Sequence, residues 1–458
     1  MIKNILFILV LFGLLQGENL QSVALKDKNL QKNLQTKQIQ RESMSNNAIS
    51  LKYIEVKDVK IPLIYESSSM LPIGFVGLIF NGGGYVNETK TSLSSFSADI
   101  LERGSKKRGE IGFANELESN AINLSVSNGI ENLKFSIEFL KEKEDKALEL
   151  LEELLSDPNL SKEALKQTKL NLTSYILSNE NNFDYIAGRN LNKLIFSGTP
   201  LENGSLGDIV SIEDIDLDNV EDYIKNTFIL DNVVLIVGGD IDIQKLEPKL
   251  ISILKKLPNG KKYQNKKYYP ISTPKSEDVK LDTKQAFIYF ASPFNFEDYE
   301  SSLHKAQVMS FILGGSGFGS RIMEEVRVKR GLAYSAYAYN VINNTTSYTS
   351  GYLQTKLENK DEAIKVVKQV IANFVKNGVT QKELDDAKAY ILGSRVLSQE
   401  TLSQRINQKY INFTRNLPLN YDEILAQKIK KLSLGELNSY IKSHSEILNL
   451  SFSIVSNE

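Results

Sequence analysis

Apolar and polar residues follow two patterns along the chain, and each pattern occurs twice. Short, nearly continuous apolar runs at residues 75–80 and 286–290 predict buried strands. Longer stretches that open at Asp145 and Asp361 carry apolar residues at helical spacing, which predicts an amphipathic helix after each strand. The apolar positions are Ala147, Leu150, Leu151, Leu154 and Leu155 in the first stretch, and Ala363, Val367, Val370, Ile371 and Phe374 in the second.

The repetition continues toward the end of each half. A second helix is expected after Ser161 and again after Thr380, because each hydroxyl residue can cap the first turn. Each half then closes on an apolar strand, at residues 233–237 and 450–455. The two copies are displaced by 216 to 219 positions at the two helices and the closing strand. The pattern therefore predicts an α+β fold with two homologous domains, each a mainly antiparallel sheet with helices packed on one face.

The N-terminal residues resemble a secretory signal peptide. Lys3 precedes an apolar run at residues 5–15 that is followed by polar residues, and a membrane-spanning helix needs about 20 apolar residues. We therefore expect an exported, periplasmic protein of a bacterium without a stable transmembrane anchor. The predicted division of the chain is a signal peptide at 1–17, a flexible leader at 18–50, an N-terminal domain at 51–256, a linker at 257–280 and a C-terminal domain at 281–458.

Composition removes several function classes. The 55 Lys and Arg residues nearly balance 56 Asp and Glu residues, which does not favour a nucleic-acid partner. The chain has no Cys, so disulfides and thiolate chemistry are excluded. It has two His, His304 and His444, and neither has other ligand-type residues at suitable spacing. Most zinc, haem and Ser-His-Asp chemistry is thereby excluded.

Two glycine-rich segments and one carboxylate pair allow alternative interpretations. Residues 81–84 predict a hairpin turn. The glycines Gly314, Gly315, Gly317 and Gly319 indicate either a loop that caps a helix or a flexible loop that contacts substrate. Asp99 and Glu102 share one helix face, where they form either a solvated pair or part of a site for a hard cation.

The segment around Arg327 and Tyr334 carries the most specific signal. It predicts a helix from Ser320 that Gly331 ends, followed by a strand from residue 332. An Arg and a Tyr at these places supply a guanidinium fork and a phenolic hydroxyl, which suit a peptide carbonyl or a developing oxyanion. The alternative is an Arg on a solvated helix end and a Tyr in an amphipathic strand.

This segment, with its Gly-Leu-Ala-Tyr core, resembles the C-terminal domain of the pitrilysin/insulinase family of inverted-motif zinc metallopeptidases. The bacterial relatives of the mitochondrial processing peptidase are the most similar branch. The resemblance extends from about residue 51 to the C-terminus and includes the segments 81–84, 113–125 and 237–240. It implies two similar α+β domains, pairs of chains that enclose extended peptides as an added strand, and Arg327 and Tyr334 as the substrate-orienting pair.

The chain departs from the family where the zinc should bind. Active members carry H-x-x-E-H on an early helix, and a Glu ligand follows about 75 residues later. Aligning Gly104 and Ser105 with the family's Gly-Thr puts Ser95 and Asp99 at the two His positions and Ala98 at the general base. The later ligand falls at residues 173–175, where no carboxylate stands.

The resemblance therefore implies a degenerate zinc site and a chain that is inactive alone. The leading hypothesis is a non-catalytic, substrate-binding subunit that has no metal or cofactor of its own. It would form a heterodimer with an active, zinc-containing family member and bind extended peptides through Arg327 and Tyr334. One alternative is a peptide-binding or scaffold protein of the cell envelope. The other is an independent enzyme with a metal site at Asp99 and Glu102.

Overall fold

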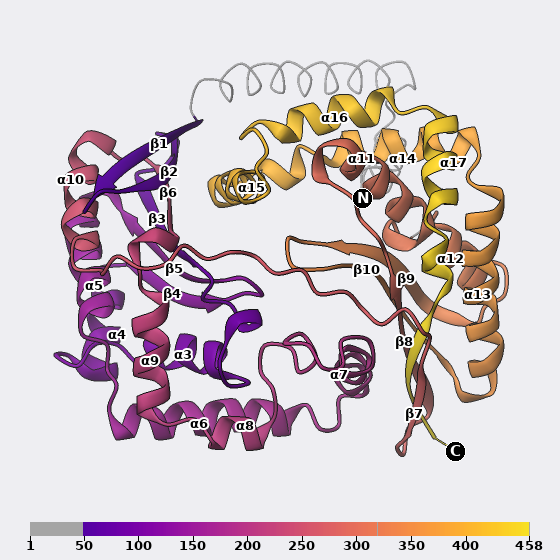
Figure 1. Ribbon diagram of the computed structural model, residues 1–458, viewed down its shortest axis with the longest axis horizontal. Coiled ribbons are helices and arrows are strands. Elements are labelled where there is room, and N and C mark those ends of the chain that lie inside the picture. The colour runs from indigo at the N-terminus through magenta and orange to yellow at the C-terminus, as the bar shows by residue number, and fades with distance from the viewer. Residues whose placement is uncertain (1–48, 318, 458) are drawn as a thin grey trace, which may run out of the picture.

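The computed structural model describes residues 49–317 and 319–457, which form two halves joined by an extended connection (Figure 1). The predicted signal peptide and nearly all of the predicted leader lie outside the described residues. The first half contains a six-stranded sheet in the order β1-β2-β6-β3-β5-β4. Its strands are β1 (Ile49–Val56), β2 (Val59–Ser67), β3 (Ile73–Asn81), β4 (Asn123–Asn128), β5 (Asn132–Leu140) and β6 (Val233–Gly239).

The second half contains a five-stranded sheet in the order β7-β11-β8-β10-β9. Its strands are β7 (Ser276–Lys280), β8 (Gln285–Pro293), β9 (Ala333–Ile342), β10 (Ser347–Lys356) and β11 (Ser451–Ser456). In each sheet one strand pair is parallel, β2 with β6 and β7 with β11, and the other pairs are antiparallel.

The two sheets share one topology. Removing β1 from the first leaves β2-β6-β3-β5-β4, which corresponds strand for strand to β7-β11-β8-β10-β9. The closing strand of each half therefore inserts beside its central apolar strand. Those central strands are apolar on both faces because both faces are covered, and in β3 and β6 nearly every residue is buried. The predicted α+β fold of two similar, mainly antiparallel units is confirmed.

Helices from each half cover one face of that half's sheet, as the sequence pattern predicts. In the first half these are α3 (Leu93–Leu101), α4 (Gly109–Ser119), α5 (Glu144–Ser156), α6 (Lys162–Ser178), α8 (Ile209–Glu213), α9 (Leu217–Thr227) and α10 (Ile243–Leu254). In the second half they are α11 (Tyr299–Ser310), α12 (Arg321–Met323), α13 (Lys360–Asn377), α14 (Gln381–Ser394), α16 (Tyr421–Lys431) and α17 (Leu434–Ser443). The expected N-caps are present, since Ser161 and Thr380 each accept a backbone hydrogen bond from the first turn that follows.

The second face of each sheet is covered by a helix that belongs to the other half. Helix α7 (Phe183–Ile195) extends from the first half onto β8 and β11, and α15 (Leu402–Thr414) extends from the second half onto β2 and β6 (Figure 1). The helix α15 begins 219 residues after α7, so the two are equivalent elements of the repeat. The halves therefore exchange one helix each.

Both exchanged helices are anchored by apolar and polar contacts. Ile406 of α15 is fully buried against the first sheet, and its position is possible because Gly238 has no side chain; a Cβ there would lie 2.2 Å from Ile406 Cδ1. Arg405 of α15 donates to the buried carboxylate of Glu66 on β2 at 2.6 Å. On the other side, Leu191 of α7 is buried in a cluster with residues of β8.

Three details of the sequence interpretation are corrected. Residues 81–84 form no hairpin turn, because β3 pairs with β5 and β6 and the chain after it continues into a short 3₁₀ helix, η1 (Tyr85–Asn87), and then α3. Strand β1 begins at Ile49, inside the expected leader. The last part of the expected linker is β7, while residues 258–275 form neither helix nor strand.

None of the helices in residues 49–317 and 319–457 combines the length and the apolar character that crossing a bilayer requires.

We predict that Ile406→Ala lowers the free energy of unfolding by about 2–4 kcal/mol, because it opens a cavity where α15 packs on the opposite sheet. Urea unfolding followed by circular dichroism measures this. The control is Leu397→Ala, whose side chain is largely exposed and whose loss should change stability by less than about 0.5 kcal/mol. Equal stability of the two variants would contradict the anchoring role of α15.

Candidate functional site

The degenerate zinc-site positions lie on α3, and the start of this helix is held by the partly buried carboxylate of Glu88. Glu88 accepts hydrogen bonds from the backbone amides of Ser92 and Ser94, at 2.9 and 3.0 Å, and from the Ser94 hydroxyl. Ser92 has a left-handed backbone (φ 74°), which a non-glycine residue adopts only when other contacts compensate. Its hydroxyl bonds the carbonyl of Leu206 at 2.6 Å, so the turn into α3 is rigidly determined.

The three positions that correspond to the family's zinc motif are occupied by groups that are already satisfied. The Ser95 hydroxyl donates to the carbonyl of Ser205 and accepts from the Asn128 side chain. Ala98 is buried and has no polar group to act as a base. The Asp99 carboxylate forms an ion pair with Arg103 at 3.0 Å.

Arg103 also pairs with Glu110 at 2.7 Å, so its guanidinium joins two carboxylates across the end of α3. The charge of Asp99 is therefore already balanced by a guanidinium of the chain itself. The third ligand position, residues 173–175, lies on α6, which packs against α3. Its side chains are Thr, Ser and Tyr, so the resident residues do not fit a zinc ion.

Glu102, the other half of the suggested carboxylate pair, turns toward the sheet. Its carboxylate accepts the backbone N–H of Val126 at 2.8 Å, and burial raises the pKa of Glu102. Val126 lies in β4, an edge strand, so Glu102 satisfies an amide that would otherwise face outward. Within the described part of the chain no group of three or more metal-binding side chains is present, and Asp99 and Glu102 are engaged by different partners. The cation-site interpretation of this pair is not supported.

Arg327 and Tyr334 are brought together by the fold. The helix expected from Ser320 is α12 followed by a π-helical segment, η5 (Glu324–Val328), and Gly331 ends it in a left-handed conformation (φ 61°). The guanidinium of Arg327 lies over the ring of Tyr334, with 4.6 Å between its carbon and the ring centroid. Tyr334 is the second residue of the edge strand β9 and is 81% exposed, and its ring lies against the Arg327 guanidinium.

The four glycines of the predicted loop have different roles. Gly314 and Gly315 lie in a second π-helical segment, η4 (Phe311–Gly315). Gly314 is buried, and a Cβ there would come within 2.3 Å of the backbone nitrogen of Ala338 on β9, so its role is close packing. Gly317 and Gly319 have left-handed backbones (φ 65° and 88°) and form the turn into α12.

The degenerate positions and the Arg–Tyr pair lie in different halves. Helix α3 is in the first half and β9 in the second, on opposite sides of Figure 1. The sequence reasoning missed Glu88 and the contact between Glu102 and Val126. The Glu88 carboxylate accepts from amides four and six residues later in the chain, beyond the reach of an ordinary N-cap, so the sequence carried no signal for this contact.

Burial raises the pKa of Glu88 to about 7, although its hydrogen bonds to Ser94 and Ser92 act in the opposite direction. The unfolded chain ionises this group near pH 4.5, so between about pH 4.5 and 7 the folded state binds one proton more. The free energy of unfolding should therefore fall as the pH rises through this window, by about 3 kcal/mol. Urea unfolding at pH 5, 6, 7 and 8 measures the slope.

Glu88→Gln should remove this part of the pH dependence, even though the amide also weakens the cap. The exposed Glu118→Gln is the matched control and should keep the slope of the unaltered protein. The same slope in all three proteins would show that Glu88 ionises normally.

Two family models match the chain, one in each half. The model described as insulinase, peptidase family M16, matches residues 64–208, and the model described as the peptidase M16 inactive domain matches residues 214–391. Among solved structures, the peptidase M16 inactive domain from Pseudomonas fluorescens superposes with a TM-score of 0.82, covering 89% of this chain and 98% of that one. A protease from Helicobacter pylori superposes with a TM-score of 0.75 over 89% of this chain and all of that one. At 22% and 14% identity these two show the fold.

Similar sequences cover nearly the whole chain. A protein of Helicobacter pylori named "Non-peptidase homolog YmxG" is 42% identical over 417 residues, which is 91% of this chain and 96% of the relative. An "Uncharacterized zinc protease YmxG" of Bacillus subtilis is 23% identical over 79% of this chain and 86% of its own. The resemblance seen in the sequence is confirmed, and the chain belongs to the insulinase family, peptidase family M16.

Proposed function

We propose that this chain is the non-catalytic, substrate-binding subunit of a heteromeric zinc peptidase. The partner is a family member that carries an intact H-x-x-E-H site, and together the two chains process or degrade peptides. One observation carries the proposal. The Arg327–Tyr334 pair is assembled with an exposed ring, whereas Asp99, at a zinc-ligand position, is held by Arg103.

The chemistry of hydrolysis explains why a partner is needed. In this family a zinc-bound water attacks the peptide carbonyl, and a Glu removes its proton. Here Ala98 stands at the position of that base and cannot take a proton, and Ser95 is engaged by backbone and amide groups. The chain therefore contributes no general base at this place, and the partner must supply both the metal and the base.

Arg327 and Tyr334 supply hydrogen-bond donors that the partner's zinc site can use. Hydrogen-bond donors aimed at a developing oxyanion stabilise the tetrahedral intermediate. In the proposed complex Arg327 donates to substrate carbonyl oxygens and Tyr334 donates to the oxyanion. The stacking of the guanidinium on the ring fixes the relative orientation of the two donors before substrate arrives.

Two further features support an exported protein that assists rather than performs proteolysis. The Helicobacter pylori relative is named a non-peptidase homologue. A solved structure of similar fold, with a TM-score of 0.74, is titled the periplasmic protease PqqL from Escherichia coli. With the signal-like residues 1–17, these observations favour the periplasm as the place of action.

Replacing Tyr334 by Phe should lower the turnover of the mixed complex by about 10²-fold, because the ring stays over Arg327 while the oxyanion donor is lost. The assay is peptide hydrolysis by the chain together with the peptidase that co-purifies with it from envelope extract. Tyr339→Phe, a partly exposed residue of the same strand, is the control and should leave turnover unchanged. Native mass spectrometry checks that both variants still assemble.

An unchanged rate for Tyr334→Phe would contradict the role of the pair. A chain that associates only with itself, and never with a peptidase, would instead favour the peptide-binding or scaffold function.

The purified chain alone should contain no stoichiometric zinc and hydrolyse no peptide, because Asp99 is paired with Arg103 and no carboxylate stands at residues 173–175. Elemental analysis after gel filtration, and a fluorogenic peptide assay with and without a chelator, measure these two properties. Hydrolysis by the chain alone that stops on chelation would overturn the proposed function.

A further inference from the structure

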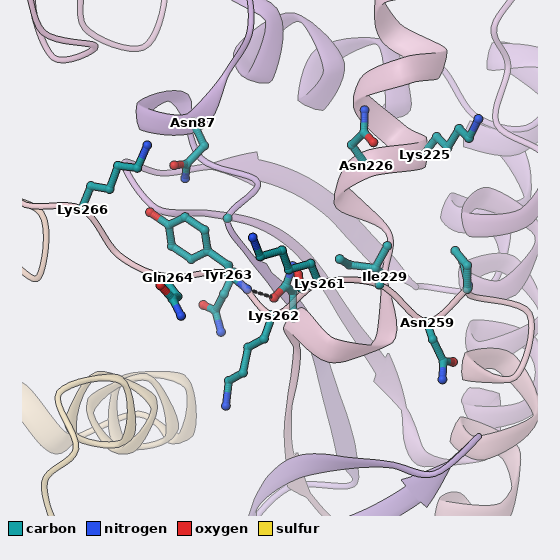
Figure 2. Close-up of a pocket in the computed structure, with 15 residues that line it drawn as sticks. Asn87, Lys225, Asn226, Ile229, Asn259, Lys261, Lys262, Tyr263, Gln264 and Lys266 are labelled. Atoms are coloured by element: carbon teal, nitrogen blue, oxygen red, sulfur yellow. Dashed lines mark hydrogen bonds between the residues drawn. The ribbon is translucent and has the colours of Figure 1, made fainter.

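A cavity of about 690 Å³ opens where the connection leaves the first half. Its walls come from the end of β3, from η1 and α9, and from residues 258–266 of the connection, and Figure 2 shows these side chains around it. This volume lies within the range of ligand-binding pockets in proteins. Neither the degenerate zinc positions nor the Arg327–Tyr334 pair lines this cavity, which we call the lysine groove.

Four lysines line the lysine groove, and no carboxylate does. Lys225 comes from α9, and Lys261, Lys262 and Lys266 come from the connection. Figure 2 shows Lys225 and Lys266 at opposite ends, with the other two between them. Within the described residues no ion pair involves any of these four ammonium groups. Because acidic and basic residues balance over the whole chain, this concentration of positive charge is local.

Side-chain amides also line the lysine groove. The groove is lined by the amides of Asn81, Asn87, Asn226, Asn232, Asn259 and Gln264. An amide can donate and accept at the same time, so it complements the N–H and C=O groups of an extended peptide. The side chains of Asn87 and Tyr263 interact with each other at the groove, so its polar lining is held in place by contacts within the chain.

The backbone of the groove argues against a phosphate site. Phosphate groups are usually held by free backbone N–H groups at a glycine-rich turn or a helix N-terminus. Here the N–H groups of Gly82, Gly260 and Tyr263 already donate, to the carbonyl of Glu131, to Asp231 and to Asn232, at 2.7, 2.8 and 2.6 Å. Lysines at the ends of a long groove suit several separate carboxylates better than one compact anion.

We propose that the lysine groove binds an extended, acidic segment of a polypeptide. The four lysines pair with Asp or Glu side chains of that segment, and the asparagine amides bond its backbone. The proposal deepens the proposed function and rests on it only in taking the ligand to be a polypeptide. It adds a substrate class, polypeptides with an acidic stretch, and a second contact far from the cleaved bond.

The test measures binding of two labelled peptides to the purified chain by fluorescence anisotropy. One peptide alternates Glu with Ser, and the other has Gln at each Glu position. We expect the Glu peptide to bind at least about tenfold more tightly at 50 mM salt, and to lose most of this advantage at 500 mM salt, where charges are screened. Equal affinity for the two peptides would overturn the proposal.

A pair of matched variants locates the binding. The first replaces Lys225, Lys261, Lys262 and Lys266 by Gln. The second replaces Lys52, Lys60, Lys166 and Lys284, four exposed lysines outside the groove, and changes the net charge by the same amount. The groove variant should lose the preference for the Glu peptide, and the control variant should keep it. Equal loss in both would show non-specific attraction and overturn the proposal.

Two further measurements test whether the ligand is a polypeptide or a phosphate, and whether the groove assignment stands without the proposed function. In competition experiments, inorganic triphosphate and a single-stranded RNA are compared with unlabelled Glu peptide. If either displaces the labelled Glu peptide at a concentration tenfold lower than the unlabelled peptide needs, the groove is a phosphate site instead. Tyr334→Phe should bind the Glu peptide normally, because Tyr334 does not line the groove. If the chain binds this peptide but never stimulates a peptidase, the proposed function fails while the groove assignment stands.

Discussion

The exchange of α7 and α15 is the packing constraint on which the rest of the molecule depends. The central strands of each sheet are apolar on both faces, but the helices of each half cover only one face. The uncovered face of one sheet receives a helix from the other half, with Ile406 buried on one side and Leu191 on the other. Because exposing either face would place a large apolar surface in water, neither half reaches its full stability alone. Because the exchanged helices already hold the two halves together, the connection between them needs no packing of its own and can be extended.

The degenerate zinc site illustrates how a fold retains a helix whose metal ligands are absent. Leaving a partly buried charge unpaired is costly. The charged groups of α3 have partners within the protein: Arg103 pairs with Asp99 and Glu110, and the Glu102 carboxylate accepts the edge amide of Val126. These side chains thereby balance the charge of the carboxylates, as a bound cation would, but they cannot activate water. The helix keeps its place, and only the hydrolytic chemistry is missing.

Features suited to a peptide occur away from that helix. The Arg327–Tyr334 pair lies at the edge of the second sheet, and the lysine groove lies where the connection leaves the first half. A protein that binds a polypeptide without cutting it needs separated contacts of this kind, because affinity then comes from several weak interactions along an extended chain. The contacts differ in chemistry, since one offers donors to carbonyl oxygens and the other offers cations to carboxylates. The proposed role of a peptide-binding subunit rests on these two features and not on the degenerate zinc site.

The sequence by itself determined the two-part α+β fold and the degeneracy of the zinc site. Both depend on local information: apolar residues at strand and helix periods, hydroxyl caps at Ser161 and Thr380, and the absence of imidazoles at Ser95 and Asp99. The tertiary structure alone decided which half covers the second face of each sheet, because α7 and α15 have the same amphipathic pattern whichever sheet they contact. It also decided the partners of Asp99 and Glu102, and the gathering of Lys225 with lysines of the connection. These contacts join residues that are distant in sequence, and the periodicity of apolar residues along the chain does not predict which distant residues come into contact.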